Sequence, residues 1–214
     1  MKVLFTHSYF LQFDEKQRVQ RKPYPPLATI QAASYLRENQ FDVALFDTNF
    51  SNSAEELIPH LEKEKPDVLV IYDDGFNYLT KMCLTKMREA AFEMIQMARL
   101  RNIPVFVSSS DSTDHFEEYL EKGADAVILG EADETLLEVC KALKENKNPK
   151  EIDGLSRLEN GNSIKNKGRK ILTDLSSLPL PAWDLINIKP YQDAWSIHGY
   201  FSINLATTRG CPFK

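Results

Sequence analysis

Short apolar runs recur along the first two thirds of the chain and alternate with longer stretches in which apolar residues have helical spacing. Runs of three or four apolar residues are typical of strands buried on both faces of a parallel sheet. Five such runs occur, at residues 3–5, 43–46, 68–71, 105–107 and 126–129. Helices are predicted between and after them, near residues 27–38, 54–64, 78–101, 114–122 and 134–146. This alternation predicts βαβ units with right-handed crossovers, and hence a doubly wound α/β domain on a five-stranded parallel sheet.

The longest predicted helix, at residues 78–101, carries an apolar stripe that should lie on the sheet. The stripe consists of Cys83, Met87, Ala90, Ala91, Met94 and Ala98. Such a stripe is more often core packing than a cofactor contact, so we interpret Cys83 as a small buried hydrophobic residue. Cys140 lies among the apolar residues of the helix at 134–146, and we interpret it in the same way.

The pattern changes after Pro149. Two short runs flank Asn160-Gly161, a dipeptide suited to the positive backbone angles of a tight turn, so a small β-hairpin is predicted. Residues 178–183 contain two prolines and are predicted to be an extended connector. A last strand pattern at residues 200–206 has no partner and is not stable alone. We therefore divide the chain into a first domain of residues 1–148, a hairpin and proline-rich linker of residues 149–198, and the beginning of a second domain at residues 199–214.

Composition narrows the classes of partner. Asp and Glu outnumber Lys and Arg by 31 to 26, so the broad positive surface that nucleic-acid binding requires is missing. No apolar run approaches the roughly 20 residues of a membrane span, and the N-terminus lacks the regions of a signal peptide, which favours a cytoplasmic protein. Cys83, Cys140 and Cys211 are far apart and form no Cys-x-x-Cys pair, so neither a disulfide framework nor an internal zinc site is indicated.

Candidate binding residues follow from the predicted topology. In an open doubly wound sheet, ligands bind beyond the carboxyl ends of the strands, at the point where the strand order reverses. With a flavodoxin-like order 2-1-3-4-5, this point lies between the first and third strands. The candidates in the loops after the first, third, fourth and fifth strands are His7, Ser8, Tyr9, Asp73, Gly75, Asn77, Tyr78, Ser108, Ser109, Ser110, Gly130, Glu131 and Thr135.

Some of these positions allow a second interpretation. The serine run at residues 108–110 could offer hydroxyl and backbone donors to a phosphate or an amide. Taken alone, such a run more often caps a helix, here through Ser112, Thr113 or Asp114. Gly130 could admit the close approach of a ligand to the backbone or relieve a turn, and its place on the ligand edge favours ligand contact.

No common nucleotide-binding motif accompanies these residues. Neither Gly-x-Gly-x-x-Gly nor Gly-x-x-x-x-Gly-Lys is present, which disfavours ordinary dinucleotide or P-loop binding. His7 ends the first strand at an edge where a metal ligand or a base could act, but a lone histidine there is more often a hydrogen-bonded loop residue. We therefore assign no catalytic residue.

The order and spacing of short segments along nearly the whole chain resemble those of cobalamin-binding domains attached to radical SAM enzymes. The segments are Pro25-Pro26-Leu27, Phe41-Asp42-Val43, Asp47, Pro66-Asp67-Val68, Asn77-Tyr78, Gly123-Ala124-Asp125 and residues 32–39, 130–136, 177–184 and 208–213. The resemblance implies a Rossmann-like fold that binds cobalamin, with the corrin above the strand ends and the nucleotide tail among the loops after the third, fourth and fifth strands. It also implies that the full-length protein is a radical SAM enzyme, most often a methyltransferase, although ring formation and other rearrangements occur in the family.

The end of the chain resembles the beginning of a radical SAM catalytic domain. That family has Cys-x-x-x-Cys-x-x-Cys after the first barrel strand, and the three thiolates hold a four-iron, four-sulfur cluster whose open iron binds S-adenosylmethionine. Cys211 matches the first cysteine, although on its own it could be a stray terminal cysteine. The second would follow Lys214 directly, so we expect this chain to lack the cluster and the rest of the barrel, its missing partner. The fragment should then bind its cofactor without catalysing a reaction.

Two departures from the family pattern leave alternatives open. Cobalamin domains with Asp-x-His-x-x-Gly after the first strand use the histidine as a cobalt ligand, but here Phe5, His7 and Phe10 occupy those positions. Gly-Gly-Pro-His, frequent after the fourth strand, is replaced by Ser-Ser-Ser-Asp at residues 108–111. This second departure favours a rival, a degenerate domain that has lost cobalamin and serves as a docking module. Another rival is a flavin-binding flavodoxin-like domain, although Asp73-Asp74 would place negative charge beside the flavin phosphate.

Overall fold

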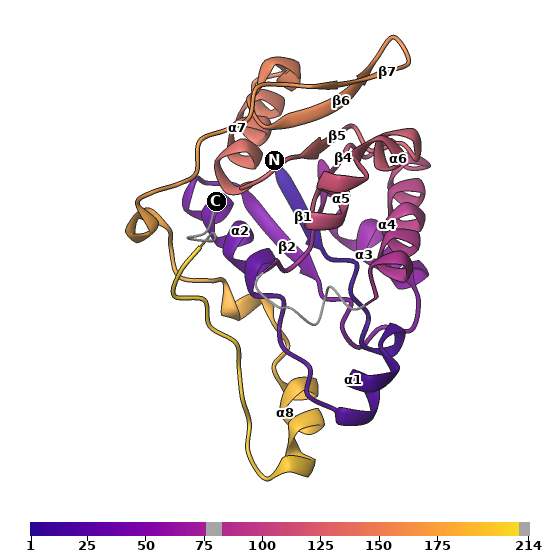
Figure 1. The fold of residues 1–214 in the computed structure, drawn as a ribbon, viewed down its shortest axis with the longest axis vertical. Helices are drawn as coiled ribbons and strands as arrows, with labels where there is room; N and C mark the ends of the chain where they lie inside the picture. The colour runs from indigo at the N-terminus through magenta and orange to yellow at the C-terminus, as the bar shows by residue number, and fades with distance from the viewer. Residues whose placement is uncertain (76–82, 210–214) are drawn as a thin grey trace.

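A mixed seven-stranded sheet runs through the centre of the computed structural model, which describes residues 1–75 and 83–209 (Figure 1). The strand order is β2-β1-β3-β4-β5-β6-β7. The parallel strands are β1 (Lys2–Thr6), β2 (Asp42–Phe46), β3 (Val68–Tyr72), β4 (Val105–Ser108) and β5 (Ala126–Ile128). The antiparallel strands are β6 (Leu155–Glu159) and β7 (Asn162–Lys165). The order of the first five strands confirms the predicted doubly wound, flavodoxin-like core.

The hairpin extends the sheet, whereas the sequence placed it in the linker outside the five-stranded sheet. β6 pairs antiparallel with β5, and Ile128 lies opposite Leu155. The turn itself is as predicted, because Asn160 and Gly161 have φ angles of 52° and 80°. Without β6, the outer side of β5 would leave backbone N–H and C=O groups without sheet partners, and pairing with the hairpin satisfies them. The sheet is therefore seven-stranded.

Helices cover both faces of the sheet, which explains why its parallel strands are apolar throughout (Figure 1). Val3 and Phe5 of β1 join the core under α2 and α7, whereas Leu4 joins the core under α3, α4 and α6, as the two-residue period of a strand requires. The helices are α1 (Glu15–Gln20), α2 (Leu27–Glu38), α3 (Leu57–Glu64), α4 (Leu84–Arg99), α5 (Ser110–Asp114), α6 (Phe116–Glu121), α7 (Asp133–Lys144) and α8 (Lys189–Trp195). None of the helices in the two described ranges is long and apolar enough to cross a membrane.

Two of the predicted helices differ most from the structure. The helix predicted from residue 78 begins at Leu84, and Cys83 is its half-buried N-cap residue, so the expectation that Cys83 belongs to the core is wrong. The rest of the stripe packs as predicted, and Cys140 is fully buried. The helix predicted at residues 114–122 corresponds to α6, and a separate short helix, α5, precedes it. His115 divides the two because it leaves the helical region with φ −117° and ψ 29°.

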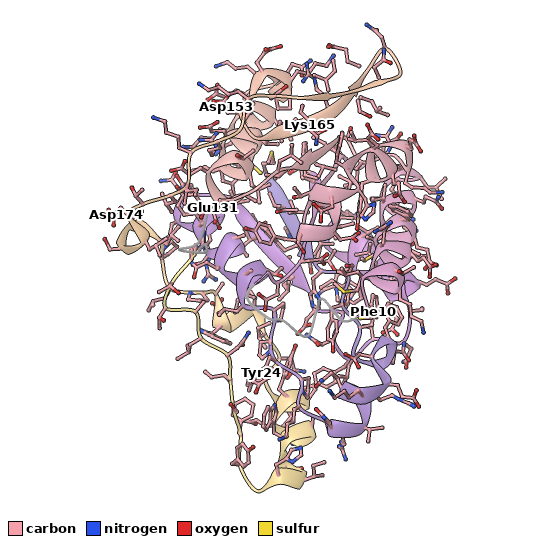
Figure 2. The ribbon with its side chains drawn as sticks, in the orientation of Figure 1. Phe10, Tyr24, Glu131, Asp153, Lys165 and Asp174 are labelled. Atoms are coloured by element: carbon pink, nitrogen blue, oxygen red, sulfur yellow. The ribbon has the colours of Figure 1, made fainter. Side chains whose placement is uncertain are left out.

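The C-terminal third contains structure that the proline pattern did not predict. The linker includes α8, which has Pro190 in its first turn, where a missing N–H costs no hydrogen bond. Tyr24 of the N-terminal segment lies against α8, with its ring centroid 5.4 Å from that of Trp195 (Figure 2). Residues 200–206 have no regular secondary structure, because no neighbouring strand pairs with them. Short 3-10 helices occur at Leu11–Phe13, Ala54–Glu56, Pro149–Glu151, Leu175–Ser177, Trp183–Leu185 and Ser196–His198.

Candidate cofactor-binding site

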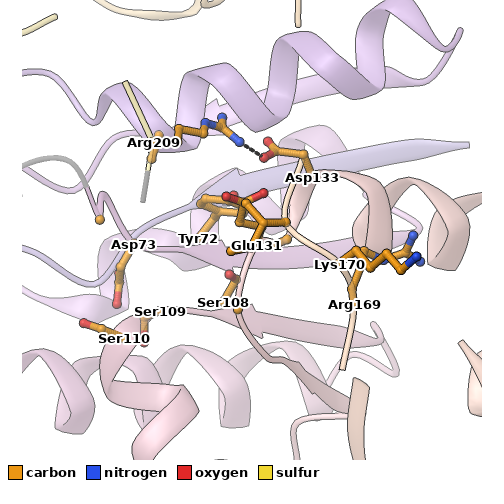
Figure 3. Close-up of a pocket in the computed structure, with 15 residues that line it drawn as sticks. Tyr72, Asp73, Ser108, Ser109, Ser110, Glu131, Asp133, Arg169, Lys170 and Arg209 are labelled. Atoms are coloured by element: carbon orange, nitrogen blue, oxygen red, sulfur yellow. Dashed lines mark hydrogen bonds and ion pairs between the residues drawn. The ribbon is translucent and has the colours of Figure 1, made fainter. Parts of the chain in front are cut away.

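A cavity of about 420 Å³ opens at the carboxyl ends of β3, β4 and β5 (Figure 3). The candidates that line it are Asp73, Gly75, Ser108, Ser109, Ser110, Gly130 and Glu131. The other lining residues, which were not among the candidates, are Ala28, Tyr72, Ala132, Asp133, Arg169, Lys170, Ile171 and Arg209. The strand-end rule therefore located three loops of the cavity. The loop after β1 does not line it, so the cavity is displaced from the expected point between the first and third strands toward β4 and β5. The rule also did not find the wall contributed by residues after the hairpin.

The remaining candidates do not line the cavity or fall outside the described ranges. Those that lie elsewhere are His7, Ser8, Tyr9 and Thr135. Those outside the described residues are Asn77, Tyr78 and Cys211. The structure places the side chains of His7, Ser8 and Thr135 in hydrogen bonds inside the protein, and it buries Tyr9, whose backbone carbonyl accepts a hydrogen bond from Thr48.

His7 is buried between the ends of β1 and β2. Its side chain is 2% exposed, and its Nε2 atom lies 2.9 Å from Asp47 Oδ1. Its Nδ1 atom lies 3.1 Å from Thr48 Oγ1. The Thr48 hydroxyl also donates to the backbone carbonyl of the buried Tyr9, at 2.8 Å. Both ring nitrogens of His7 are therefore engaged, and the residue is a hydrogen-bonded loop histidine.

The carboxylate of Asp47 connects this histidine to the linker. Its Oδ2 atom accepts a hydrogen bond from the Tyr191 hydroxyl at 2.7 Å, and its Oδ1 atom accepts one from the Asn49 backbone N–H at 3.1 Å. Asn49 Nδ2 in turn donates to the Tyr191 hydroxyl at 2.8 Å. Burial alone would raise the pKa of Asp47, but the hydrogen bonds from His7, Tyr191 and Asn49 together hold that pKa below its ordinary value.

Replacing Asp47 with asparagine is expected to lower the free energy of unfolding at pH 7 by about 1–3 kcal/mol, because the charged acceptor is lost. A carboxyl group whose pKa is depressed by folding stabilises the protein above its unfolded pKa, and this contribution disappears as the pH falls through the folded pKa. The difference between wild type and Asp47→Asn should therefore shrink below about pH 4. Urea denaturation between pH 7 and pH 3 measures this difference in the free energy of unfolding. A difference that stays constant over this range would contradict the lowered pKa of Asp47.

Ser8 and Asp73 join the loops after β1 and β3. Asp73 Oδ1 accepts hydrogen bonds from the Ser8 backbone N–H at 2.7 Å and from the Ser8 hydroxyl at 2.9 Å. Burial raises the pKa of Asp73 and outweighs the opposing effect of these two bonds. Ser8 thus supports a residue of the cavity wall instead of lining the cavity itself.

Asp74, which the sequence placed beside Asp73 at the ligand edge, caps a helix. Its side chain is buried and accepts hydrogen bonds from the backbone N–H groups of Leu27 at 3.0 Å and Ala28 at 3.3 Å, in the first turn of α2. These amides have no partner within the helix, and a carboxylate there also complements the positive end of the helix dipole. Of the two aspartates, only Asp73 presents charge to the cavity.

The serine loop after β4 both caps a helix and lines the cavity. Ser109 is the N-cap residue of α5: its Oγ accepts from the Ser112 N–H at 2.8 Å, and the Ser112 hydroxyl accepts from the Ser109 N–H at 2.9 Å. This reciprocal pair is a capping box. The capping interpretation is therefore confirmed, but the capping group is Ser109, because the helix begins earlier than predicted.

Asp111 fixes the same loop to α4. Its side chain is 5% exposed, and its carboxylate oxygens accept from Arg88 Nη2 at 2.7 Å and Arg88 Nε at 2.8 Å. The Tyr119 hydroxyl donates to Asp111 Oδ2 at 2.9 Å. A two-point guanidinium contact of this kind restricts orientation as well as distance. Asp111, which directly follows the serine run, therefore holds the loop in place.

The loop after β5 offers open backbone to the cavity, and a buried acceptor lies beside it. Gly130 has a φ of 75°, and no atom lies within 4 Å of the place that a Cβ would take, so a ligand can approach its backbone. Asp133 is buried and pairs with Arg209 at the cavity (Figure 3). Its Oδ1 atom has no hydrogen-bond partner among residues 1–75 and 83–209. Such an atom is costly unless a ligand or water satisfies it.

Comparison with protein families places this geometry in a known context. Residues 21–140, more than half of the chain, match the family described as the B12 binding domain. The matched range contains all the loops that follow β2, β3, β4 and β5.

Individual relatives are longer proteins. The chain is 27% identical over 195 residues to an uncharacterized methyltransferase of Pyrococcus horikoshii, covering 89% of this chain and 39% of that protein. It is 22% identical to an anaerobic magnesium-protoporphyrin IX monomethyl ester cyclase of Synechocystis, covering 91% of this chain and 38% of that protein. The chain therefore spans less than two fifths of the length of these relatives.

Solved structures share the fold at lower sequence identity. The cobalamin-dependent S-adenosylmethionine radical enzyme OxsB, with aqua-cobalamin bound, superimposes with a TM-score of 0.64 at 19% identity, over 86% of this chain and 24% of that chain. The radical S-adenosylmethionine methyltransferase TsrM from Kitasatospora setae gives a TM-score of 0.61 at 17% identity, over 78% of this chain and 30% of that chain. The fold is common to all three proteins.

Proposed function

Because this chain belongs to the B12-binding domain family, we propose that the cavity at the ends of β3, β4 and β5 binds the nucleotide tail of cobalamin, with the corrin lying across the strand ends. The observation that carries the proposal is the position of the cavity. It lies at the ligand edge of the sheet, and loops from three neighbouring strands meet there.

The residues of the cavity fit such a group. Its volume of about 420 Å³ falls within the roughly 300–1,000 Å³ of small-molecule sites and suits a base with its ribose better than a whole corrin. Gly130 leaves its backbone open, and the Ser108 and Ser110 hydroxyl groups can donate or accept hydrogen bonds. Ala28 and Tyr72 supply apolar wall, and the buried ion pair of Asp133 with Arg209 adds charged groups beside it. We assign these residues to holding and orienting the tail.

The full-length protein is proposed to be a radical SAM methyltransferase or a related radical enzyme. Bound methylcobalamin would supply a transferable methyl group. In this proposal, residues 199–214 begin the catalytic barrel, Cys211 is the first ligand of the iron-sulfur cluster, and S-adenosylmethionine binds only in the longer protein. The names of the relatives and their greater length support this proposal. This chain alone is expected to bind and orient cobalamin.

Titration of the purified chain with hydroxocobalamin tests the binding. A saturable shift of the corrin absorbance bands is expected, together with a red colour that persists after gel filtration. If the bands do not shift at high ligand excess, the cobalamin proposal fails and the docking-module alternative takes its place.

A substitution that fills the cavity locates the site. Ser110 lines the cavity and is exposed, so Ser110→Trp adds bulk there without disturbing the core. The dissociation constant for cobalamin should rise at least about tenfold, a loss of about 1.4 kcal/mol of binding free energy. Asp114→Trp places the same bulk on the same helix outside the cavity and should bind as the wild type does. Equal affinities in both variants would place the binding site elsewhere.

A further inference from the structure

One wall of the cavity comes from an irregular segment far along the chain. Residues 167–172, here called the strap, follow the hairpin and run past the N-terminal end of α7 (Figure 1). Arg169, Lys170 and Ile171 of the strap line the cavity. Ile171 is 68% exposed, so an apolar side chain stands at the cavity wall without being used in the core.

Hydrogen bonds at both ends hold the strap in place. At its beginning, the Lys167 carbonyl accepts from the Gly154 N–H at 2.8 Å. At its end, the Leu172 N–H donates to Glu131 Oε2 at 2.8 Å. An irregular segment loses conformational freedom when it is ordered, so bonds of this kind are needed to keep it as a wall.

Arg169 ties the middle of the strap to α7. Its side chain is 16% exposed, and Nε donates to Thr135 Oγ1 at 2.8 Å. Its Nη1 and Nη2 atoms pair with Glu134 at 3.2 Å and Glu138 at 2.5 Å. Thr135 also donates to the Asp153 carbonyl at 3.2 Å, which connects α7 to the start of the hairpin. The guanidinium therefore bridges two turns of the helix that begins at the cavity.

These contacts give Glu131 and Thr135 a different task from direct cofactor contact. The Glu131 carboxylate accepts a hydrogen bond from the strap, at Leu172. The Thr135 hydroxyl accepts one from Arg169 of the strap and donates one to the Asp153 carbonyl, just before the hairpin. We propose that the strap is a wall of the nucleotide-tail site, and that Arg169, Thr135 and Glu131 are positioning residues that hold it against the ribose and base of cobalamin. This inference rests on the proposed function. It predicts that the strap recognises the tail and not the corrin.

Cobinamide, which keeps the corrin and cobalt but lacks the nucleotide tail, separates these possibilities. In Arg169→Met, the dissociation constant for cobalamin should rise roughly 10- to 100-fold, because charge-assisted bonds that fix the strap are lost. The constant for cobinamide should stay within about twofold of the wild-type value. Thr135→Val, which removes one acceptor of Arg169, should shift the cobalamin constant in the same direction by less. Arg169→Lys should recover part of the affinity, because an ammonium group can still pair with Glu134 and Glu138.

Arg101→Met is the matched control. Arg101 is also a partly buried arginine that pairs with a carboxylate, Glu62 at 3.3 Å, but it does not line the cavity. Both ligands should bind this variant as they bind the wild type. Circular dichroism of Arg169→Met should match the wild type, and Thr135→Val provides a second route if it does not.

Trypsin gives a readout that needs no substitution. The strap contains Lys167, Arg169 and Lys170, and cobalamin should slow cleavage at these residues in the wild type, whereas cobinamide should not. Equal protection by both ligands, or equal weakening of both ligands in Arg169→Met, would overturn the strap inference while leaving cobalamin binding intact. A wild-type chain that binds neither ligand would instead overturn the proposed function, and the strap inference with it.

Discussion

Replacing Arg88 with methionine is expected to lower the free energy of unfolding by about 3–5 kcal/mol, because a buried carboxylate then loses its cation. Asp111 is 5% exposed and depends on Arg88 for two of its hydrogen bonds. The hydrogen bond to Asp111 also raises the pKa of Arg88, and an arginine guanidinium is effectively always charged in proteins. Urea or guanidinium denaturation at pH 7 measures the loss. It should be accompanied by weaker cobalamin binding, since Asp111 directly follows the serine loop of the cavity.

Two controls test the origin of this effect. Arg99→Met removes an exposed pair with Asp125 and should cost no more than about 1 kcal/mol. The double variant Arg88→Met/Asp111→Asn should recover part of the stability, because the amide is neutral and can still accept from Tyr119. A loss below about 1 kcal/mol in Arg88→Met alone would show that Asp111 is not buried as a charged group.

Replacing Trp195 with alanine is expected to cost about 3–5 kcal/mol of the free energy of unfolding, the usual range for a large aromatic residue in a core. Trp195 is 2% exposed, and its Nε1 atom donates to the Pro23 carbonyl at 2.8 Å. Its ring lies 5.4 Å from the rings of both Tyr24 and Tyr200, measured between centroids. The residue therefore joins the N-terminal segment, α8 and the segment that leads to the C-terminus.

Trp183→Ala is the matched control for this prediction. Trp183 is the only other tryptophan in the chain and is only partly buried, so its removal should cost less. Denaturation followed by circular dichroism compares the two variants without relying on tryptophan fluorescence. Equal losses in the two variants would contradict the prediction that Trp195 contributes more to the packing of the linker than Trp183 does.

The core of the fold could be predicted from the sequence because its signals are local. Strands buried on both faces must be apolar at every position, and runs such as Val68–Tyr72 stand out for that reason. The hairpin turn at Asn160-Gly161 was equally visible. Its attachment to β5 was not, because strand pairing between residues about 30 positions apart depends on which edge of the sheet is free.

The residues of the candidate site also differ in whether the sequence could predict them. The strand-end rule found Asp73, Ser109 and Gly130 because topology alone brings the loops of parallel strands to one edge. The rule also selected His7, but the His7 ring forms hydrogen bonds with Asp47 and Thr48. The sequence could not exclude His7, because no sequence pattern predicts the direction of a loop side chain. Arg169 was missed because it reaches the cavity from beyond the hairpin, through contacts with α7 that only the folded chain brings together.

The added hairpin also changes how the protein meets other molecules. A three-residue apolar strand such as β5 at the outside of the sheet would be a ready template for strand addition, and so for aggregation. Instead, the outermost strand on that side is β7, four residues long, which begins with a polar asparagine and ends with Lys165. Short, polar, lysine-bearing strands are poor templates for strand addition. The hairpin, which leads into the strap, therefore also protects this side of the domain from self-association.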